Sequence, residues 1–314
     1  MLAERVPERY EVTVERPADF AEFWAETMTA AAAIPLNPRL DHIPLRSTPE
    51  VDTYELHYDS LDGLRIAGWY CVPRGSTLPP PYPALLLAPG YISEPTLPKS
   101  WARKGYAAIG LAPRGKLRSN AVFNPGYPGL LVHHITDRDT YSYRGFYVDA
   151  TRAVDVLLGR PEVDAGRIGI YGSSQGGTLA LTTAALRPDA IACGVAGVPY
   201  LCAIMDAARL TRSYPYEEIN EYLRMHPDDE PLVRRTVAYF DGLNFAPRIQ
   251  APMLIYVGLE DDVCPPETGL AAYDALRGPK QLHALPRCAH DAGNGRIMPY
   301  VEEFLATHLK PARP

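Results

Sequence analysis

The 314-residue sequence lacks any long uninterrupted run of apolar residues. A membrane-spanning helix needs about 20 of them, so a protein that crosses a bilayer is not expected. The first nine residues, Met1–Arg9, also lack the apolar core of a secretory signal peptide. We therefore expect a cytoplasmic protein that has no membrane partner.

Excess positive charge and paired cysteines are also missing. The chain carries 31 lysines and arginines against 37 aspartates and glutamates, which gives a formal net charge of −6. Because nucleic acids and anionic membranes attract basic proteins, neither is expected as a partner. The five cysteines are scattered and contain no C-x-x-C pair. This pattern argues against a disulfide framework or a cysteine metal knuckle, and we expect these side chains to be reduced and mostly buried.

The sequence does contain a regular alternation of strand and helix patterns. A helix is predicted over residues 19–33, and strands over 51–58 and 64–72. Further strands are predicted at 84–88, 107–112, 167–171, 191–196, 253–257 and 281–285, with helices at 99–104, 147–158, 175–185, 270–276 and 298–309. Strands and helices that alternate in this way indicate an α/β fold with a mostly parallel central sheet and helices on both faces.

The interval from about residue 199 to residue 248 interrupts this alternation. It is helical in pattern, rich in tyrosine and charge, and lies between two predicted core strands. We interpret it as a cap inserted over one end of the sheet. The length of the chain allows one or two domains, and we predict a single domain over residues 1–314 that includes this insertion.

The strongest chemical signal is Gly172-Ser173-Ser174-Gln175-Gly176, which matches the pattern G-x-S-x-G. A predicted buried strand precedes it and a helix of small residues follows, which is the context of the nucleophile elbow in α/β-hydrolases. There the serine lies at the positive end of a helix, and the Gln175 N–H points to where an oxyanion would form. A glycine-rich turn can match by chance, but the flanking elements favour Ser174 as a nucleophile.

An acid and then a histidine should follow the serine along the chain in this fold. The acid is expected just after a later core strand, and strand 253–257 is followed by Glu260, Asp261 and Asp262. Spacing alone does not select among these three carboxylates. A solvated acidic turn is the alternative interpretation.

The histidine is expected between the last strand and the final helix, where His290 is the candidate. Other histidines either precede the acid in the chain or fall within predicted elements, where packing or surface roles are more common. The pair His133-His134, with Asp137 and Asp139 nearby, could suggest a metal site. Adjacent loop histidines more often serve as surface or interface residues, so no metal is predicted.

A second oxyanion donor is expected from the loop after strand 84–88. That loop begins with Pro89-Gly90-Tyr91. Gly90 permits a sharp bend, after which the Tyr91 N–H can point into the site and the Tyr91 ring can line the acyl pocket. An ordinary turn with a packed tyrosine is the alternative.

These residues resemble the acetyl xylan esterase and cephalosporin-C deacetylase family, carbohydrate esterase family 7. The resemblance covers most of the chain and is densest at residues 137–150, at the elbow, at 239–241 and at 258–266. The family has the α/β-hydrolase fold, so this resemblance implies that fold for the chain.

Site residues follow from the resemblance position by position. It implies Ser174 as the nucleophile, Asp261 as the acid and His290 as the base. It also implies that the Tyr91 and Gln175 amides form the oxyanion hole. It is the resemblance that selects Asp261 over its two acidic neighbours.

Three motifs depart from the family pattern. The family's Arg-Gly-Gln appears here as Arg114-Gly115-Lys116, its Gly-Gly-Ser-Gln-Gly has Ser173 at the second position, and its His-Glu appears as His290-Asp291. None of these changes removes a triad member, and we expect Arg114 to tie loops together. The loop after Tyr91 also looks short, so acyl and alcohol preferences can differ from those of the family.

The implied function is a serine esterase that hydrolyses short-chain, mainly acetyl, esters of carbohydrates or small molecules through an acyl-enzyme intermediate. No metal or organic cofactor has a role in this chemistry. In the cap, Tyr214-Pro215-Tyr216 is expected to narrow the acyl side, so Pro215 and Tyr216 join Tyr91 as predicted substrate-binding residues. Family members form ring-shaped hexamers, and a homo-oligomer is therefore expected.

Three alternatives remain open at this stage. The first is an esterase with a different acyl or alcohol preference, and the second is an amidase or peptidase on the same fold. The third is a binding module that keeps the fold without catalysis, although all three triad positions are filled. The sequence does not identify the physiological ester.

Overall fold

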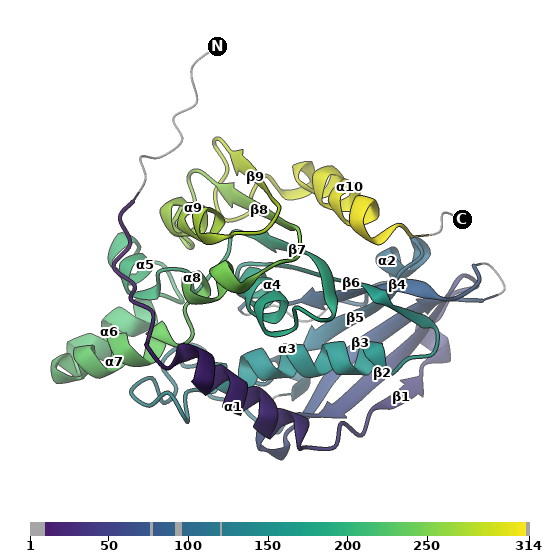
Figure 1. Cartoon of the computed structure of the whole chain (residues 1–314), viewed down its shortest axis with the longest axis horizontal. Helices are drawn as coiled ribbons and strands as arrows, with labels where there is room; N and C mark the ends of the chain where they lie inside the picture. The colour runs from purple at the N-terminus through teal and green to yellow at the C-terminus, as the bar shows by residue number, and fades with distance from the viewer. Residues whose placement is uncertain (1–9, 76–77, 92–95, 120, 312–314) are drawn as a thin grey trace, which may run out of the picture.

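A central sheet of nine strands organises the computed structural model, which describes residues 10–75, 78–91, 96–119 and 121–311 (Figure 1). The strand order is β1-β2-β3-β5-β4-β6-β7-β8-β9. The strands are β1 (Arg39–His42), β2 (Val51–Asp59), β3 (Arg65–Pro73), β4 (Tyr82–Ala88), β5 (Ala107–Ala112), β6 (Val163–Ser173), β7 (Ile191–Gly197), β8 (Met253–Gly258) and β9 (Lys280–Leu285).

Strand pairing is parallel over most of the sheet, as predicted. Five pairings are parallel: β5 with β4, β4 with β6, β6 with β7, β7 with β8, and β8 with β9. The other three, β1 with β2, β2 with β3, and β3 with β5, are antiparallel. Strand β1 was not predicted. It is only four residues long and none of its side chains is buried, so it lacks the apolar alternation that marks a strand in a sequence.

Helices cover both faces of the sheet (Figure 1). Because successive strand residues point to opposite faces, Leu85 and Leu86 of β4 enter two different cores. Leu86 joins a core with side chains from α1, α3 and α4, and Leu85 joins one with side chains from α2 and α10. The bounds are α1 (Phe20–Ala32), α2 (Lys99–Arg103), α3 (Ser142–Leu158), α4 (Gln175–Leu186), α9 (Pro266–Ala275) and α10 (Met298–Leu309).

Some elements extend beyond their predicted ends. Helix α3 begins at Ser142 rather than at residue 147, because Tyr143 and Phe146 are buried aromatic residues outside the aliphatic stripe. Strand β6 begins at Val163, where polar, exposed residues hide the strand pattern. Helix α9 begins at Pro266, since proline is well suited to the first helical turn.

The segment between β7 and β8 is helical, as the sequence indicated. It contains α5 (Ile204–Leu210), α6 (Glu217–Met225), α7 (Glu230–Ala238) and α8 (Gly242–Phe245). The buried carboxylate of Asp241 joins the first and last of these helices. It accepts the N–H groups of Ala203 at 2.9 Å, Ile204 at 2.7 Å and Leu243 at 3.0 Å. We call this segment, residues 199–248, the cap.

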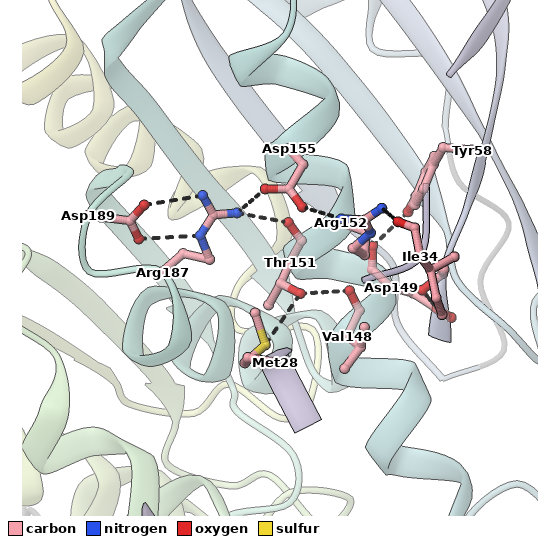
Figure 2. A network of polar contacts seen from close by, with 11 residues as sticks. Met28, Ile34, Tyr58, Val148, Asp149, Thr151, Arg152, Asp155, Arg187 and Asp189 are labelled. Carbon is pink, nitrogen blue, oxygen red and sulfur yellow. Dashed lines mark hydrogen bonds and ion pairs between the residues drawn. The ribbon is translucent and has the colours of Figure 1, made fainter. Parts of the chain in front are cut away.

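A charged network connects helix α3 with the end of α4 (Figure 2). Asp155 lies between two arginines: it contacts Arg152 at 2.9 Å and also pairs with Arg187. Arg187 reaches Asp189 at 3.2 Å as well, and Arg152 donates to the Ile34 carbonyl at 2.7 Å. The contacts hold the ends of α1 and α4 against α3. We refer to these residues as the α3 network.

All five cysteines lie within the described residues, and each is free and buried, as predicted. Within the same part of the chain, no helix is long and apolar enough to cross a bilayer.

Candidate active site

The carboxyl ends of five neighbouring strands lie side by side. Ala88 of β4 pairs in register with Gly172 of β6, and Gly258 of β8 with Leu285 of β9. Between these pairs, Ser173 at the end of β6 lies opposite Gly197 of β7. Every residue proposed for catalysis follows one of these strand ends. The parallel register therefore brings segments that are far apart in the chain to one edge of the sheet.

Ser174 occupies a strained turn between β6 and α4. Its φ of 58° and ψ of −122° are rare for a residue with a side chain. A Cβ on Gly172 would lie 2.4 Å from the Gly176 carbonyl oxygen, and a Cβ on Gly176 would lie 2.3 Å from the Ala88 oxygen. The glycines of the G-x-S-x-G pattern are thus required by close backbone approach. The Ser174 N–H donates to the Gly197 carbonyl at 2.9 Å and fixes the turn to β7.

Gln175 is the first residue of helix α4. Its N–H therefore belongs to the helix start, where no carbonyl lies one turn back and the helix dipole is positive. The side chain is fully buried, and its Nε2 donates to the Tyr143 hydroxyl at 2.7 Å. This anchor to α3 fixes the peptide that carries the predicted oxyanion donor.

Asp261 is the one of the three competing acids that meets the histidine. Its Oδ2 lies 2.8 Å from Nδ1 of His290. Its Oδ1 accepts the N–H groups of Val263 at 2.9 Å and Cys264 at 2.8 Å. Asp261 is buried, whereas Glu260 and Asp262 are exposed. Burial and hydrogen bonding thus distinguish a carboxylate that spacing could not select.

Close packing of two loops makes this contact possible. The Leu259 N–H donates to the Leu285 carbonyl at 3.0 Å, and the Glu260 N–H donates to the Cys288 carbonyl at 2.9 Å. A Cβ on Gly258 would lie 2.1 Å from the Ala289 oxygen, so the loop before His290 rests directly on the end of β8. Since Nδ1 of His290 faces Asp261, the other ring nitrogen, Nε2, is the one that can exchange a proton with a substrate or nucleophile.

Cys264 connects the serine with the acid loop. Burial raises the pKa of its thiol well above the usual value, the Asp261 charge raises the pKa further, and a hydrogen bond with the Ser174 side chain opposes both. The Cys264 N–H binds Asp261 at the same time. A loop of four residues therefore touches the Ser174 side chain and holds the carboxylate that pairs with His290.

Tyr91 follows β4 and is held by its ring. The hydroxyl donates to Oε1 of Glu218 at 2.7 Å and accepts the Leu131 N–H at 3.0 Å. The ring packs against Tyr200 with centroids 5.9 Å apart, and the Tyr200 N–H donates to the Ser174 carbonyl at 3.1 Å. Tyr91 is thereby tied to the elbow and to the cap. Residues 92–95, in the loop that the sequence predicted to be short, lie outside the described residues.

Comparison with known proteins identifies the family. The family model described as acetyl xylan esterase matches residues 4–308, nearly the whole chain. The chain belongs to the acetyl xylan esterase family. The esterase is 30% identical over 298 residues to acetyl esterase Axe7A of Xylanibacter ruminicola, a match that covers 90% of this chain and 66% of that protein. The chain thus spans slightly less than two thirds of this curated relative.

Solved structures of the same family are closely similar. An acetyl xylan esterase from Paenibacillus sp. R4 superimposes with a TM-score of 0.88 at 33% identity, covering 96% of this chain and 97% of that one. Acetyl xylan esterase 1 from a Thermoanaerobacterium species gives a TM-score of 0.86 at 27% identity, covering 95% and 96%. These matches show the α/β-hydrolase fold and a carboxylic ester hydrolase, as the sequence indicated.

The two substrate-binding residues predicted in the cap are both buried. Tyr216 has no exposed surface in the esterase: its ring lies 4.7 Å from that of Tyr200, and its hydroxyl accepts the Leu201 N–H at 2.8 Å. Pro215 is buried beside it, whereas Tyr214 is exposed. A role for Pro215 and Tyr216 in substrate binding stays a prediction, and the contact shown for Tyr216 is with the ring of Tyr200.

Arg114 ties loops together, as expected. Its Nε lies 3.0 Å from the Asp149 carboxylate, and both side chains are buried. It also contacts Asp62 at 2.7 Å and the Leu61 carbonyl at 2.8 Å. The guanidinium passes so close to Gly145 that a Cβ there would lie 1.9 Å from Nη1.

The adjacent histidines have a local partner. Nδ1 of His133 lies 2.7 Å from the Ser142 hydroxyl, and the ring stacks on that of His134 with centroids 4.2 Å apart. In the described ranges, no group of three or more histidine, cysteine, aspartate or glutamate side chains is placed to hold a metal ion.

Two residues near the site were missed in the sequence. Glu218 is a buried carboxylate on α6, and it accepts the Tyr91 hydroxyl and the Gly129 N–H, the latter at 2.8 Å. In the sequence it sits among Glu217 and Glu221, where acids usually mark a solvated face. Lys116 was noted only as a departure from the family motif. Tyr216, Ile219 and Tyr222 around Glu218 predict a buried helix face, but they do not indicate that a carboxylate lies beside it.

Proposed function

We propose that the esterase removes acetyl and other short acyl groups from carbohydrates or small molecules through a Ser174–His290–Asp261 triad. The observation that carries this proposal is the 2.8 Å contact between His290 Nδ1 and buried Asp261. The strained elbow conformation of Ser174 adds support. The names of the relatives, acetyl esterase and acetyl xylan esterase, support the acyl preference.

The first step forms an acyl-enzyme. Nε2 of His290 accepts the Ser174 hydroxyl proton as Oγ attacks the ester carbonyl carbon, and the carbonyl π electrons move to its oxygen. The Tyr91 and Gln175 N–H groups stabilise this oxyanion, at about 3 kcal/mol for each donor by analogy with other hydrolases. When the carbonyl re-forms, the bond to the alcohol oxygen breaks, and protonated His290 donates its proton to the leaving alkoxide.

The second step releases the acid. His290 removes a proton from a water molecule as the water oxygen attacks the acyl carbon. The tetrahedral oxyanion returns to the same two N–H groups and then collapses, breaking the bond to Ser174 Oγ, which takes the proton back from His290. Asp261 keeps the imidazole in the required tautomer and stabilises its charged form in both steps. Each step is acid–base and acyl-transfer chemistry of the chain's own residues.

Packed rings on the cap side favour a short acyl group. Tyr91, Tyr200 and Tyr216 form consecutive ring contacts, and the last two are fully buried. A well-packed wall of this kind leaves little room for a long chain, because protein interiors resist insertion of extra methylene groups. An amidase or peptidase is the weaker candidate, because amide leaving groups need more protonation than the alkoxide of an ester.

A hydrolysis panel tests the proposal. Nitrophenyl acetate, butyrate and octanoate, acetylated xylan and a peptide anilide would be compared with the wild-type enzyme and Ser174→Ala. We expect acetate to be preferred, the peptide anilide to be cleaved negligibly, and Ser174→Ala to be inactive with an unchanged melting temperature. Activity retained by Ser174→Ala would reject the triad, and efficient cleavage of the anilide would favour the peptidase alternative.

Assembly and cellular location are part of the same proposal. From the family resemblance we expect a homo-oligomer, and a cytoplasmic location and one domain in each subunit stay predictions from the sequence. Analytical ultracentrifugation of the full chain at micromolar concentration tests the assembly. A monomer under these conditions would contradict it.

A further inference from the structure

Lys116 is a buried lysine that binds backbone carbonyls. Only 2% of its surface is exposed. Its Nζ donates to the Gly90 carbonyl at 2.8 Å and also to the Tyr91 carbonyl. Within the described residues it forms no salt bridge, in contrast to Arg114 two positions earlier, which pairs with buried Asp149. Gly115, with a φ of +74°, makes the turn that separates these two side chains.

Such a placement is costly for a lysine. Lysines are rarely buried without a charged partner, because the ammonium loses its hydration. Here burial lowers the pKa of Lys116 to about 7. The aromatic faces of Tyr91 and Phe146 lie 5.2 and 5.9 Å from Nζ, so the surroundings supply π faces and carbonyl oxygens rather than a carboxylate. Because burying this ammonium costs free energy, a functional role for Lys116 is indicated.

The geometry of a peptide bond indicates that role. The Gly90 carbonyl and the Tyr91 N–H belong to one planar trans peptide, in which C=O and N–H point in opposite directions. A donor that holds the carbonyl on one side therefore fixes the direction of the N–H on the other. The far end of Tyr91 is fixed independently, because its hydroxyl binds Glu218.

We propose that Lys116 is a positioning residue for ester hydrolysis, which aims the Tyr91 N–H at the oxyanion by holding the Gly90 and Tyr91 carbonyls. The inference rests on the proposed function, since it assumes that the Tyr91 amide is an oxyanion donor. An oxyanion exists only in the tetrahedral intermediate and the transition states that flank it. If the Tyr91 N–H no longer points at the oxyanion, kcat should therefore fall while KM stays nearly unchanged.

Two substitutions separate positioning from packing. Lys116→Met keeps the volume and removes every donor, whereas Lys116→Gln keeps N–H donors on a shorter side chain. We expect kcat for nitrophenyl acetate to fall about ten- to hundredfold in Lys116→Met, below the about 10²- to 10³-fold loss for a deleted donor. In Lys116→Gln the fall should be several-fold. KM should stay within about twofold in both.

A boronic acid inhibitor gives a second readout. Its tetrahedral adduct with serine places an oxygen where the oxyanion forms, so its Ki should rise by the same factor as kcat falls. Lys104→Met is the matched control, because Lys104 is a half-exposed lysine that pairs with Glu302 away from the site. This variant should have wild-type kcat and Ki. Melting temperatures and labelling of Ser174 by a fluorophosphonate confirm that each variant is folded.

Several outcomes would overturn the inference. They are a wild-type kcat in Lys116→Met, a loss that appears in KM instead of kcat, or an unchanged boronic acid Ki beside a lowered kcat. If Lys116→Met does not fold, Lys116→Gln decides, and it must then show the several-fold fall in kcat at constant KM. Activity retained by Ser174→Ala would instead reject the proposed function itself, so the two failures are distinguishable.

Discussion

The two ends of helix α4 have opposite characters. At its start, Ser174 has a strained backbone. The proposed base, His290, is 30% exposed at its side chain and is bound to Asp261 through one ring nitrogen. At the end of the helix, Arg187 is paired with Asp155 and Asp189 in the α3 network (Figure 2). One end holds groups that can still react, and the other holds charges that already have partners.

Backbone strain, rather than polar pairing, separates the two regions further. Among the described residues, buried side-chain atoms without a hydrogen-bond partner occur near both ends of α4: Gln175 Oε1 and the Tyr200 hydroxyl near its start, and Thr183 Oγ1 and Arg152 Nε near its end. The strained backbone of Ser174 has no counterpart in the α3 network, and proteins concentrate such strain at functional sites. At the end of α4, the Arg187 charge instead complements the negative end of the helix dipole. Helix α4 is thus stabilised by paired charges at one end, while the strained serine turn lies at the other.

The largest effect should come from a substitution of Asp261, the partner of His290. Asp261→Asn keeps an oxygen for the N–H groups of Val263 and Cys264 but presents an amide to His290. The wrong imidazole tautomer would then be stabilised, and we expect kcat to fall about 10⁴-fold. Steady-state kinetics and thermal unfolding measure the two consequences. A kcat within tenfold of wild type would contradict the role of Asp261, while the melting temperature should change little.

The second-largest effect is expected from a substitution in the turn that carries Ser174. In Gly176→Ala the new Cβ would lie 2.3 Å from the Ala88 oxygen, so β4 and α4 must move apart. We expect a loss of about 1–3 kcal/mol in unfolding free energy, together with a clear decrease in kcat. Gly166→Ala on β6 is the control, since its Cβ meets nothing closer than 3.5 Å. Chemical denaturation measures both variants, and equal stabilities would refute the packing argument.

A change at the other end of α4 should affect stability alone. Arg187→Met removes contacts to Asp155 and Asp189, but Asp155 keeps Arg152 as a partner. Charged hydrogen bonds are worth about 1.5–3 kcal/mol each, and Asp189 is mostly exposed, so we expect a total loss of about 1–3 kcal/mol. The folded fraction should retain wild-type kcat. A selective fall in kcat would show that the two ends are coupled.

The smallest effect is expected at Glu218, the buried carboxylate that binds Tyr91. Unlike Asp155, which pairs with Arg152 and Arg187, Glu218 forms no salt bridge within the described residues. Burial raises the pKa of Glu218, and its hydrogen bonds with Tyr91, Gly129 and Leu131 oppose this. Since the folded state holds the proton more tightly than the unfolded state, this group stabilises the fold less as pH rises through its folded pKa. Glu218→Gln removes that dependence.

Melting temperatures of wild type and Glu218→Gln at several pH values test this sign. The variant should compare more favourably with wild type at neutral pH than at acid pH. The opposite trend would show that the fold lowers the pKa of Glu218, as the hydrogen bond with Arg187 lowers the pKa of Asp189.

Sequence patterns predicted the reactive end better than its surroundings. Buried parallel strands are near-continuous apolar runs, so β4, β5, β7 and β8 were located to within two residues. The glycines of the elbow are visible because their cause is local. The choice of Asp261 needed either the family resemblance or the burial that only the fold reveals.

Other features depend on contacts between distant segments. Lys116 binds carbonyls 25 and 26 positions earlier, and Glu218 binds a hydroxyl 127 positions away. Neither contact follows from periodicity, because its partners are a backbone loop and a single phenol. Strand β1 escaped prediction for a different reason: at a sheet edge, partial burial leaves no apolar pattern.

A crystal structure of the enzyme after reaction with a small alkyl phosphonate would show whether Ser174, His290 and the two N–H groups act on one substrate atom. We expect a covalent bond from phosphorus to Ser174 Oγ, with Nε2 of His290 beside that oxygen. The phosphoryl oxygen should lie within hydrogen-bond distance of the Tyr91 and Gln175 N–H groups. Phosphorus bound to another residue, or an imidazole far from Ser174 in the adduct, would contradict this expectation.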